Sequence, residues 1–151
     1  MAGLRWSVGV VALVFAAVTP VIAQPTSGAG RIKTVSGSAF IVRGGAMIPA
    51  QPGQVIFEAD AIRTGADGSV GVTLKDDTRL ALGPSSEVRL DRFAYAPGSG
   101  GFGLAVMFVR GVTAYVSGRL AKLAPDSIRL ETPAAIVGVR GTSVAIRVEG
   151  S

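Results

Sequence analysis

Residues 70–82 read Val-Gly-Val-Thr-Leu-Lys-Asp-Asp-Thr-Arg-Leu-Ala-Leu, and this stretch decides the class of fold. Apolar residues alternate with small or polar ones in residues 70–74, and leucines flank an alanine in residues 80–82. Alternation with a period of two residues is typical of a strand that buries one face. Residues 75–78 lie between the two runs and are polar, which favours a chain reversal. The stretch therefore predicts a β-hairpin.

Short segments of the same kind recur outward from this hairpin in both directions. They are separated by residues that favour turns, such as Pro52-Gly53, residues 64–68 and residues 83–86. No window has apolar residues at helical spacing over three turns, and only residues 117–124 suit a helical turn. Strands that recur about every 8–12 residues predict an all-β fold. We expect a single domain of many short strands, twisted β-solenoid or β-sandwich-like.

The composition removes most catalytic chemistry from consideration. The chain has 151 residues, of which 21 are glycine, and it contains no cysteine, histidine or asparagine. Disulfides, Cys/His zinc sites, histidine-based triads and N-linked glycans are therefore excluded. A serine nucleophile with a lysine base would remain, but neither Ser-x-x-Lys nor Gly-x-Ser-x-Gly occurs. We expect a protein that is not an enzyme and that uses no cofactor and no metal.

The positive charge of the chain does not predict nucleic-acid binding. Lysine and arginine number 15 against 10 acidic residues, which gives a formal net charge of +5. The arginines are dispersed and commonly alternate with apolar residues, as on the solvated face of a half-buried sheet. Aromatic residues make up 6% of the chain, too few for a platform on which bases stack. We therefore expect no nucleic acid among the partners.

Two further patterns resemble ligand sites but have simpler explanations. Residues 98–103 match the Gly-x-Gly-x-x-Gly pattern of dinucleotide-binding loops. That mechanism requires a helix after the loop, whereas an alternating β segment follows here, so we interpret the stretch as a loop tip. The dispersed aspartates suit turns, in which their side chains bind nearby backbone N–H groups; a cation site is the alternative.

The N-terminal segment predicts export. One positive charge at Arg5 precedes an uncharged apolar run of 18 residues, Trp6–Ala23, with Pro20 close to its end. This order is typical of a secretory signal peptide, with cleavage between Ala23 and Gln24. A retained membrane anchor is the alternative, because the run reaches the lower length limit for crossing a bilayer.

Cleavage at that position divides the chain into three parts. These are a signal peptide at residues 1–23, a short linker at 24–30 and a β domain at 31–151. We expect a periplasmic protein, with secretion or membrane anchoring as alternatives. Contact with a membrane is expected only if the signal segment is uncleaved.

Three stretches of the predicted β domain occur in an order that is more specific than any one of them. They are residues 35–68, which include Asp60-Ala-Ile-Arg-Thr-Gly65; residues 70–86, which include Asp76-Asp-Thr78; and residues 130–142, which include Val139-Arg-Gly-Thr142. On these motifs the chain resembles the FecR-domain family, from about Arg31 to Val148. That family comprises the periplasmic regulatory domain of ferric-dicitrate-type sensors and its many stand-alone relatives.

The resemblance implies a function based on contact. We expect an exported, non-enzymatic module for protein interaction or signalling, with an envelope protein or surface component as its partner. The alternative is a structural envelope or surface protein with no ligand-sensing role. Sensors of the family carry a cytoplasmic segment that holds a sigma factor. Because the signal segment begins this sequence, we expect no direct sigma-factor control. The sequence stops at Ser151, where family members usually continue, so either the fold is shortened at its end or the sequence is truncated.

Four residues of the shared motifs are candidate site residues. Thr64, Asp67, Arg140 and Thr142 are predicted to line a partner or ligand groove, since loops on rigid scaffolds often carry function. A structural role is the alternative for all four.

In that structural role, Thr and Asp side chains bind backbone groups within turns, and Arg140 pairs with a carboxylate such as that of Asp60. The neighbouring glycines Gly65, Gly68 and Gly141 are then expected to have positive backbone angles.

Overall fold

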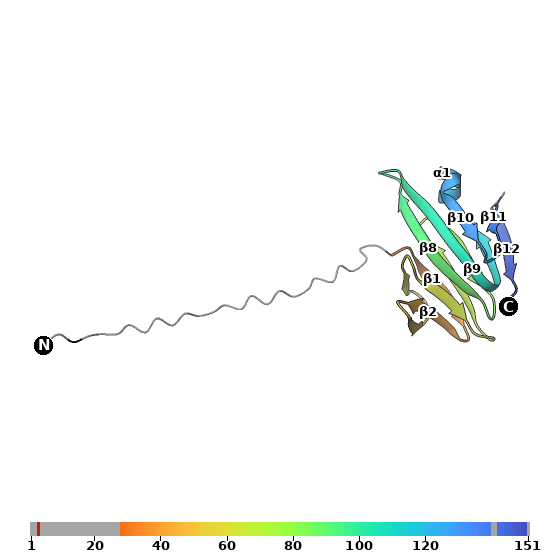
Figure 1. Cartoon of the computed structure of the whole chain (residues 1–151), viewed down its shortest axis with the longest axis horizontal. Helices are drawn as coiled ribbons and strands as arrows, with labels where there is room; N and C mark the ends of the chain where they lie inside the picture. Colours follow the sequence, from red (N-terminus) through yellow and green to blue (C-terminus); the bar gives the residue numbers. More distant parts are fainter. Residues whose placement is uncertain (1–2, 4–27, 140–141, 151) are drawn as a thin grey trace.

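The computed structural model describes Gly3, residues 28–139 and residues 142–150 (Figure 1). The elements are short strands and one helical turn, as follows in chain order: β1 (Gly30–Ser36), β2 (Ala39–Arg43), β3 (Ala46–Pro49), β4 (Val55–Ile56), β5 (Ala61–Thr64), β6 (Ser69–Leu74), β7 (Arg79–Leu82), β8 (Glu87–Ala96), β9 (Gly101–Val116), α1 (Leu120–Leu123), the 3-10 turn η1 (Pro125–Ser127), β10 (Ile128–Glu131), β11 (Ile136–Val137) and β12 (Ser143–Val148). The predicted all-β class is confirmed. Over the described residues, no helix has the length and apolar character needed to cross a membrane.

The predicted hairpin is β6 and β7. The two strands pair antiparallel, with Val70 opposite Leu82 and Val72 opposite Leu80. All four side chains are buried, because alternate residues of each strand face the same side. The chain reverses between the strands, where the N–H of Leu74 donates to the carbonyl of Thr78 at 2.8 Å.

One long strand, β9, joins two parts of the sheet. Its residues 101–110 lie between β8 and β10, and its residues 111–116 lie between β7 and β12. The change of neighbours occurs at Gly111, which has a φ of +83° that a residue with a side chain rarely adopts. We call the two parts half-sheet I (β4, β1, β6, β7, residues 111–116 of β9, and β12) and half-sheet II (β3, β2, β5, β8, residues 101–110 of β9, β10 and β11).

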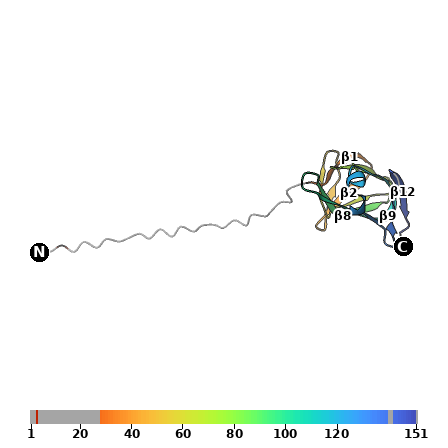
Figure 2. The same cartoon turned by 90° about the horizontal axis from the view of Figure 1, so that it is seen from above.

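The two half-sheets bury one common core. Residues of half-sheet I such as Ile32 and Tyr115 belong to the same buried cluster as Ile41 and Phe108 of half-sheet II. Seen from above, the sheet curls around this interior (Figure 2). Among the described strands, every pair is antiparallel except β9 with β10. The structure is thus one curled sheet whose parts face each other, which is nearer to the predicted sandwich than to a solenoid.

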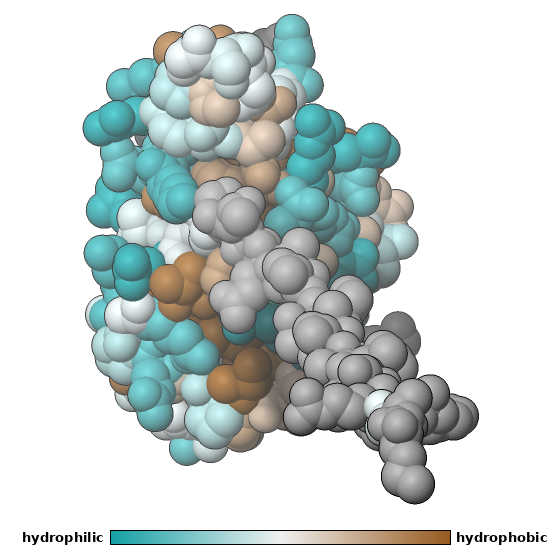
Figure 3. Space-filling model, turned by 90° about the vertical axis from the view of Figure 1, so that its left-hand side faces the viewer, coloured by the Kyte–Doolittle hydropathy of each residue, from teal (hydrophilic) through white to brown (hydrophobic). Residues whose placement is uncertain are grey.

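The surface is mainly hydrophilic, with a few apolar exceptions. Figure 3 shows one face of the molecule, on which hydrophilic residues surround smaller hydrophobic patches. Over the described residues, the large exposed hydrophobic side chains are Met47, Val112, Leu123 and Ile136. Ile136, on β11, is the most exposed of them at 65%. A single exposed apolar residue is common, so its meaning depends on what surrounds it.

The prediction for two of the turn glycines was wrong. Neither Gly65 nor Gly68 has a positive φ. The reason that glycine stands there is close packing: a Cβ on Gly68 would lie 2.0 Å from the carbonyl oxygen of Ser38. The turn at residues 64–68 therefore lies directly against the β1–β2 connection. The third glycine of that prediction, Gly141, lies outside the described residues.

Candidate functional site

Half of the acidic side chains of the described part form ion pairs with arginines. They are Asp60, Asp77, Glu87, Asp91 and Glu131. No group of three or more metal-ligating side chains occurs within residues 28–139 and 142–150. The arrangement consists of arginine–carboxylate pairs, of which some join neighbouring strands or turns and two lie within one strand, Arg89 with Asp91 on β8 and Arg129 with Glu131 on β10.

The most buried of these pairs joins Arg43, at the end of β2, to Asp60, just before β5. The Nε and a terminal nitrogen of Arg43 donate to the two carboxylate oxygens of Asp60, at 2.9 and 2.8 Å. Asp60 is 2% exposed and also accepts a hydrogen bond from the N–H of Phe57, over whose ring the guanidinium lies. The bond to Asp60 raises the pKa of the Arg43 guanidinium above its usual value.

The structural alternative pairs Arg140 with a carboxylate such as that of Asp60. Arg140 lies outside the described residues, so that pairing stays a prediction. The structure pairs Asp60 with Arg43, because β2 and β5 are neighbours in half-sheet II and bring the two side chains together. Both carboxylate oxygens already have partners in this bidentate arrangement.

Thr64 and Asp67 occupy the turn that follows β5, in two different environments. Thr64 is buried, and its hydroxyl donates to the carbonyl of Gly83 at 2.7 Å and accepts from the N–H of Ser86 at 2.9 Å. Asp67 is exposed and accepts a long bond, 3.4 Å, from the N–H of Ser38. Thr64 thus joins two turns, while Asp67 is accessible to a partner.

The other described candidate, Thr142, lies far from these two. Its carbonyl oxygen accepts hydrogen bonds from the N–H and hydroxyl of Ser117, next to Val116 at one end of the β7–β9 pairing. Thr64 lies at the other end of that pairing, where Gly83 contacts Val112. At about 3.3 Å per residue, the length of β9 between the two ends separates these threonines by roughly 15 Å. The structure therefore does not bring Thr64 and Thr142 into one groove.

The carboxylate of Asp76, one of the aspartates predicted to serve as turn residues, connects the β6–β7 turn to α1. Asp76 is fully buried and accepts hydrogen bonds from the N–H and the hydroxyl of Thr78, at 3.1 and 2.7 Å. A further bond comes from the N–H of Leu120 in α1. The neighbouring Asp77 points outward, and the Asp-Asp-Thr motif is the sequence signal for this turn.

An apolar pocket of about 360 Å³ opens near the same end of the molecule. It is lined by the end of β9, by α1 and η1, and by β10 and β11, and its residues include Tyr115, Leu130, Val137 and the exposed Ile136. Ser117 also lines it and binds the residue that precedes β12. The pocket therefore adjoins the start of β12.

The strands beside this pocket have unpaired edges. Over the described strands, β12 pairs only with β9, and β11 pairs only with β10. A strand at the edge of a sheet presents backbone N–H and carbonyl groups that another extended chain can pair with. The pocket and the two edges together form a surface suited to the addition of an extended protein segment.

Comparison with known proteins assigns the family. A search of curated proteins and a search of solved structures each found no match. A family model described as FecR protein matches residues 60–151, which is more than half of the chain. The matched part contains β5 to β12, and so it includes the Asp76 turn, the apolar pocket and the β12 edge. The chain belongs to the FecR protein family.

Proposed function

We propose that this chain is a non-enzymatic regulatory module of the cell envelope, which binds a protein partner by strand addition at β12. Membership of the FecR family supports a regulatory or signalling type of domain in general. The signal-peptide pattern before Gln24 supports export to the envelope.

The observation that carries the proposal is the edge of β12 beside the apolar pocket. β12 is a strand of six residues with one neighbour, β9, over its whole length. A partner segment in extended conformation pairs with such an edge through its backbone, while pockets nearby select its side chains. Here the pocket adjoins the start of β12, and the exposed residue Ile136 lines the pocket. We therefore expect a partner segment with a large apolar side chain at one end.

Site-specific crosslinking in the producing cell tests the location of the interface. Ala145 on β12 and Ala81 on β7 are both exposed, and each lies opposite Ala114 of β9, on its two sides. A photoreactive residue at position 145 is expected to capture one defined envelope protein, and the same residue at position 81 is expected to capture none. Equal products from both positions, or no product from either, would contradict strand addition at β12.

A pair of proline substitutions tests the pairing itself. Along an edge strand, successive residues point their N–H groups alternately toward the neighbouring strand and away from it. Of Val144→Pro and Ala145→Pro, one therefore removes a bond to β9, and the other removes only an outward N–H. The variant that retains the thermal stability of the wild type is expected to lose the crosslinked product, monitored from a photoreactive residue at position 147. Retention of the product would exclude backbone pairing.

Export is tested separately, by N-terminal sequencing of the protein in the envelope fraction. Gln24 as the first residue is the expected result. An intact Met1 with the protein in the cytoplasmic fraction would contradict the proposed location.

A further inference from the structure

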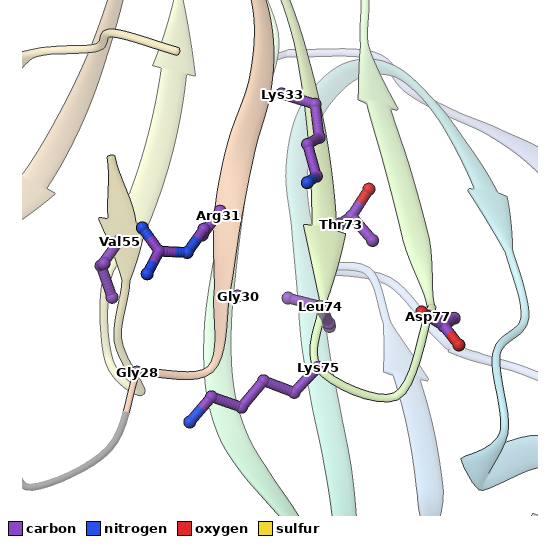
Figure 4. A pocket seen from close by; sticks show the side chains of 9 residues that line it. All are labelled: Gly28, Gly30, Arg31, Lys33, Val55, Thr73, Leu74, Lys75 and Asp77. Atoms are coloured by element: carbon purple, nitrogen blue, oxygen red, sulfur yellow. The ribbon is translucent and has the colours of Figure 1, made fainter. Parts of the chain in front are cut away.

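A hollow of about 350 Å³ on half-sheet I gathers positive side chains from two strands and a turn (Figure 4). Arg31 and Lys33 come from β1, and Lys75 follows β6. Figure 4 shows Arg31 extending toward Val55, Lys75 extending below Gly30, and Lys33 on the opposite side of β1. The cations thus surround the hollow from three directions.

The arrangement follows from strand register. Arg31 and Lys33 are two residues apart on β1 and are both exposed, and the register of β1 with β6 shifts next to Lys33, between Ile32 and Thr34. Arg31 lies opposite Thr73 of β6, and Thr73 lies opposite Arg79 of β7. A second, smaller hollow of about 200 Å³ is lined by Lys33, Thr73 and Arg79. The two hollows share Lys33 and Thr73, so four cations border one continuous surface.

These cations have no acidic partners. All ten acidic side chains of the chain lie within the described residues. Six arginines of the described part have a carboxylate within 4.0 Å, whereas Arg31, Lys33, Lys75 and Arg79 have none. Arg31 donates one hydrogen bond, to the carbonyl of Gly53 at 3.0 Å, which leaves its charge uncompensated.

The acidic residue at the rim of the hollow is engaged elsewhere. Asp77 belongs to the lining, but its carboxylate pairs with Arg119 at 3.0 Å. Figure 4 shows Asp77 beyond Thr73, on the side away from Arg31. Like charges that converge without counter-charges raise the local potential and attract anions. The surface is therefore charged for an anionic ligand.

We propose that this hollow binds the phosphate groups of a ligand that carries more than one of them. A phosphate has oxygens that point in tetrahedral directions, so it can accept hydrogen bonds from donors that approach from several sides. A carboxylate presents two oxygens in one plane and is matched best by a single arginine fork. Two lysines, which act as mobile point charges, together with Arg31 and the hydroxyl of Thr73, suit the phosphate better.

The site is separate from the β12 edge. Half-sheet I places β6, β7 and β9 between β1 and β12. Loss of phosphate binding would therefore leave the proposed partner site unaffected, and each proposal can fail without the other.

Binding of tripolyphosphate to the full chain, measured by titration calorimetry at one fixed ionic strength, is the primary test. The affinity of the double variant Lys33→Gln/Lys75→Gln for tripolyphosphate is expected to be lower by about tenfold or more, because two charges are lost from the site. The matched control Arg92→Gln/Lys122→Gln has the same net charge and changes exposed positions outside both the hollow and β12, and it is expected to bind as the wild type does. Lys33→Arg/Lys75→Arg, which retains both charges, should restore binding.

Three results would overturn the proposal. The first is no binding of tripolyphosphate by the wild type, and the second is an equal loss of binding in the two double variants. The third is equally tight binding of tricarballylate, which carries carboxylates in place of phosphates. Unchanged thermal unfolding of the variants shows that a loss of binding is not a loss of fold.

Vesicles distinguish a lipid headgroup from a soluble phosphate. Phosphatidylglycerol vesicles that bind the wild type, release it when tripolyphosphate is added and do not bind Lys33→Gln/Lys75→Gln would identify a lipid source for the same site. Binding of tripolyphosphate without binding of these vesicles would identify a soluble source. Phosphatidylcholine vesicles, which have no net charge, serve as the control. Vesicle binding that persists unchanged in the double variant would contradict the proposed site.

Discussion

The carboxylate of Asp76 accepts a hydrogen bond from the backbone N–H of Leu120, at 3.3 Å, across 44 residues of sequence. Both residues are fully buried. The helix α1 has only four residues and no side-chain cap from Arg119, so it cannot form by local propensity alone. The carbonyl of Asp76 also accepts from the N–H of Arg119, at 2.6 Å. The β6–β7 turn therefore positions α1, the only α-helix of the described part.

Asp76→Ala is expected to lower the free energy of unfolding by about 3 kcal/mol, because the buried N–H groups of Thr78 and Leu120 lose their acceptor. Urea unfolding monitored by circular dichroism measures the change. Asp77→Asn is the control at the next position, which is exposed and has a φ of 67° that asparagine tolerates. Similar losses in both variants would contradict a special role for the buried carboxylate.

Tyr115 is expected to make the domain less stable at high pH. Burial, with the nearby charge of Asp76, raises the pKa of the Tyr115 phenol to about 12. Below pH 10 the phenol is protonated in both states, whereas between about pH 10 and 12 only the unfolded state loses the proton. The free energy of unfolding should therefore fall by about 2–3 kcal/mol over that interval.

The variant Tyr115→Phe isolates this contribution, because lysines titrate in the same range. Unfolding curves for both proteins at several pH values give the comparison. The decline should be shallower in the variant; parallel declines would show that Tyr115 is not its source.

Asp60→Ala is expected to destabilise the domain by about 2–3 kcal/mol, since it leaves Arg43 without its partner and the N–H of Phe57 without an acceptor. Arg43 is partly exposed, so water compensates for some of the loss. Asp91→Ala, which removes the surface pair with Arg89, should cost about 0.5 kcal/mol or less. Thermal unfolding of the two variants distinguishes them; equal shifts would mean that burial of the pair has no energetic effect.

Gly68→Ala is expected to destabilise by about 2–4 kcal/mol, because the new Cβ would lie 2.0 Å from the backbone oxygen of Ser38 and the two turns would have to separate. Gly98→Ala is the control, since Gly98 has no neighbour within 4 Å of a Cβ and no positive φ. Calorimetric melting temperatures provide the measurement. If the melting temperature of Gly68→Ala equals that of the wild type, the turn at residues 64–68 can move away from Ser38 at no cost in stability.

Features that depend on local pattern could be predicted from the sequence. The β6–β7 hairpin and the helical turn within residues 117–124 follow from alternation or turn residues. The loop tip predicted over residues 98–103 is confirmed only as far as Gly100, because β9 begins at Gly101. Gly111 shows the limit of this reasoning, because a glycine inside a strand pattern ordinarily weakens the strand or marks an irregularity in it. In the structure a positive φ at Gly111 redirects β9 without ending it.

Features that depend on distant pairing could not be predicted in this way. The partner of Asp60 is 17 residues away on a neighbouring strand, and only the β2–β5 register selects Arg43 over other arginines. The cationic hollow likewise requires β1 to lie beside β6, and no local sequence pattern predicts that pairing. Thr64 belongs to one of the shared motifs, and its buried hydroxyl joins the end of β5 to the turn between β7 and β8, a contact that depends on distant pairing.

The continuity of β9 has a consequence for how the domain unfolds. Because β9 pairs with β7, β8, β10 and β12, neither half-sheet can lose its order without removing a central strand from the other. Two half-sheets joined only by a loop could melt separately, but these should melt in one cooperative transition. Folding has the same dependence: both half-sheets need β9, and half-sheet II is complete only when the chain has been synthesised as far as Val137 and half-sheet I as far as Val148.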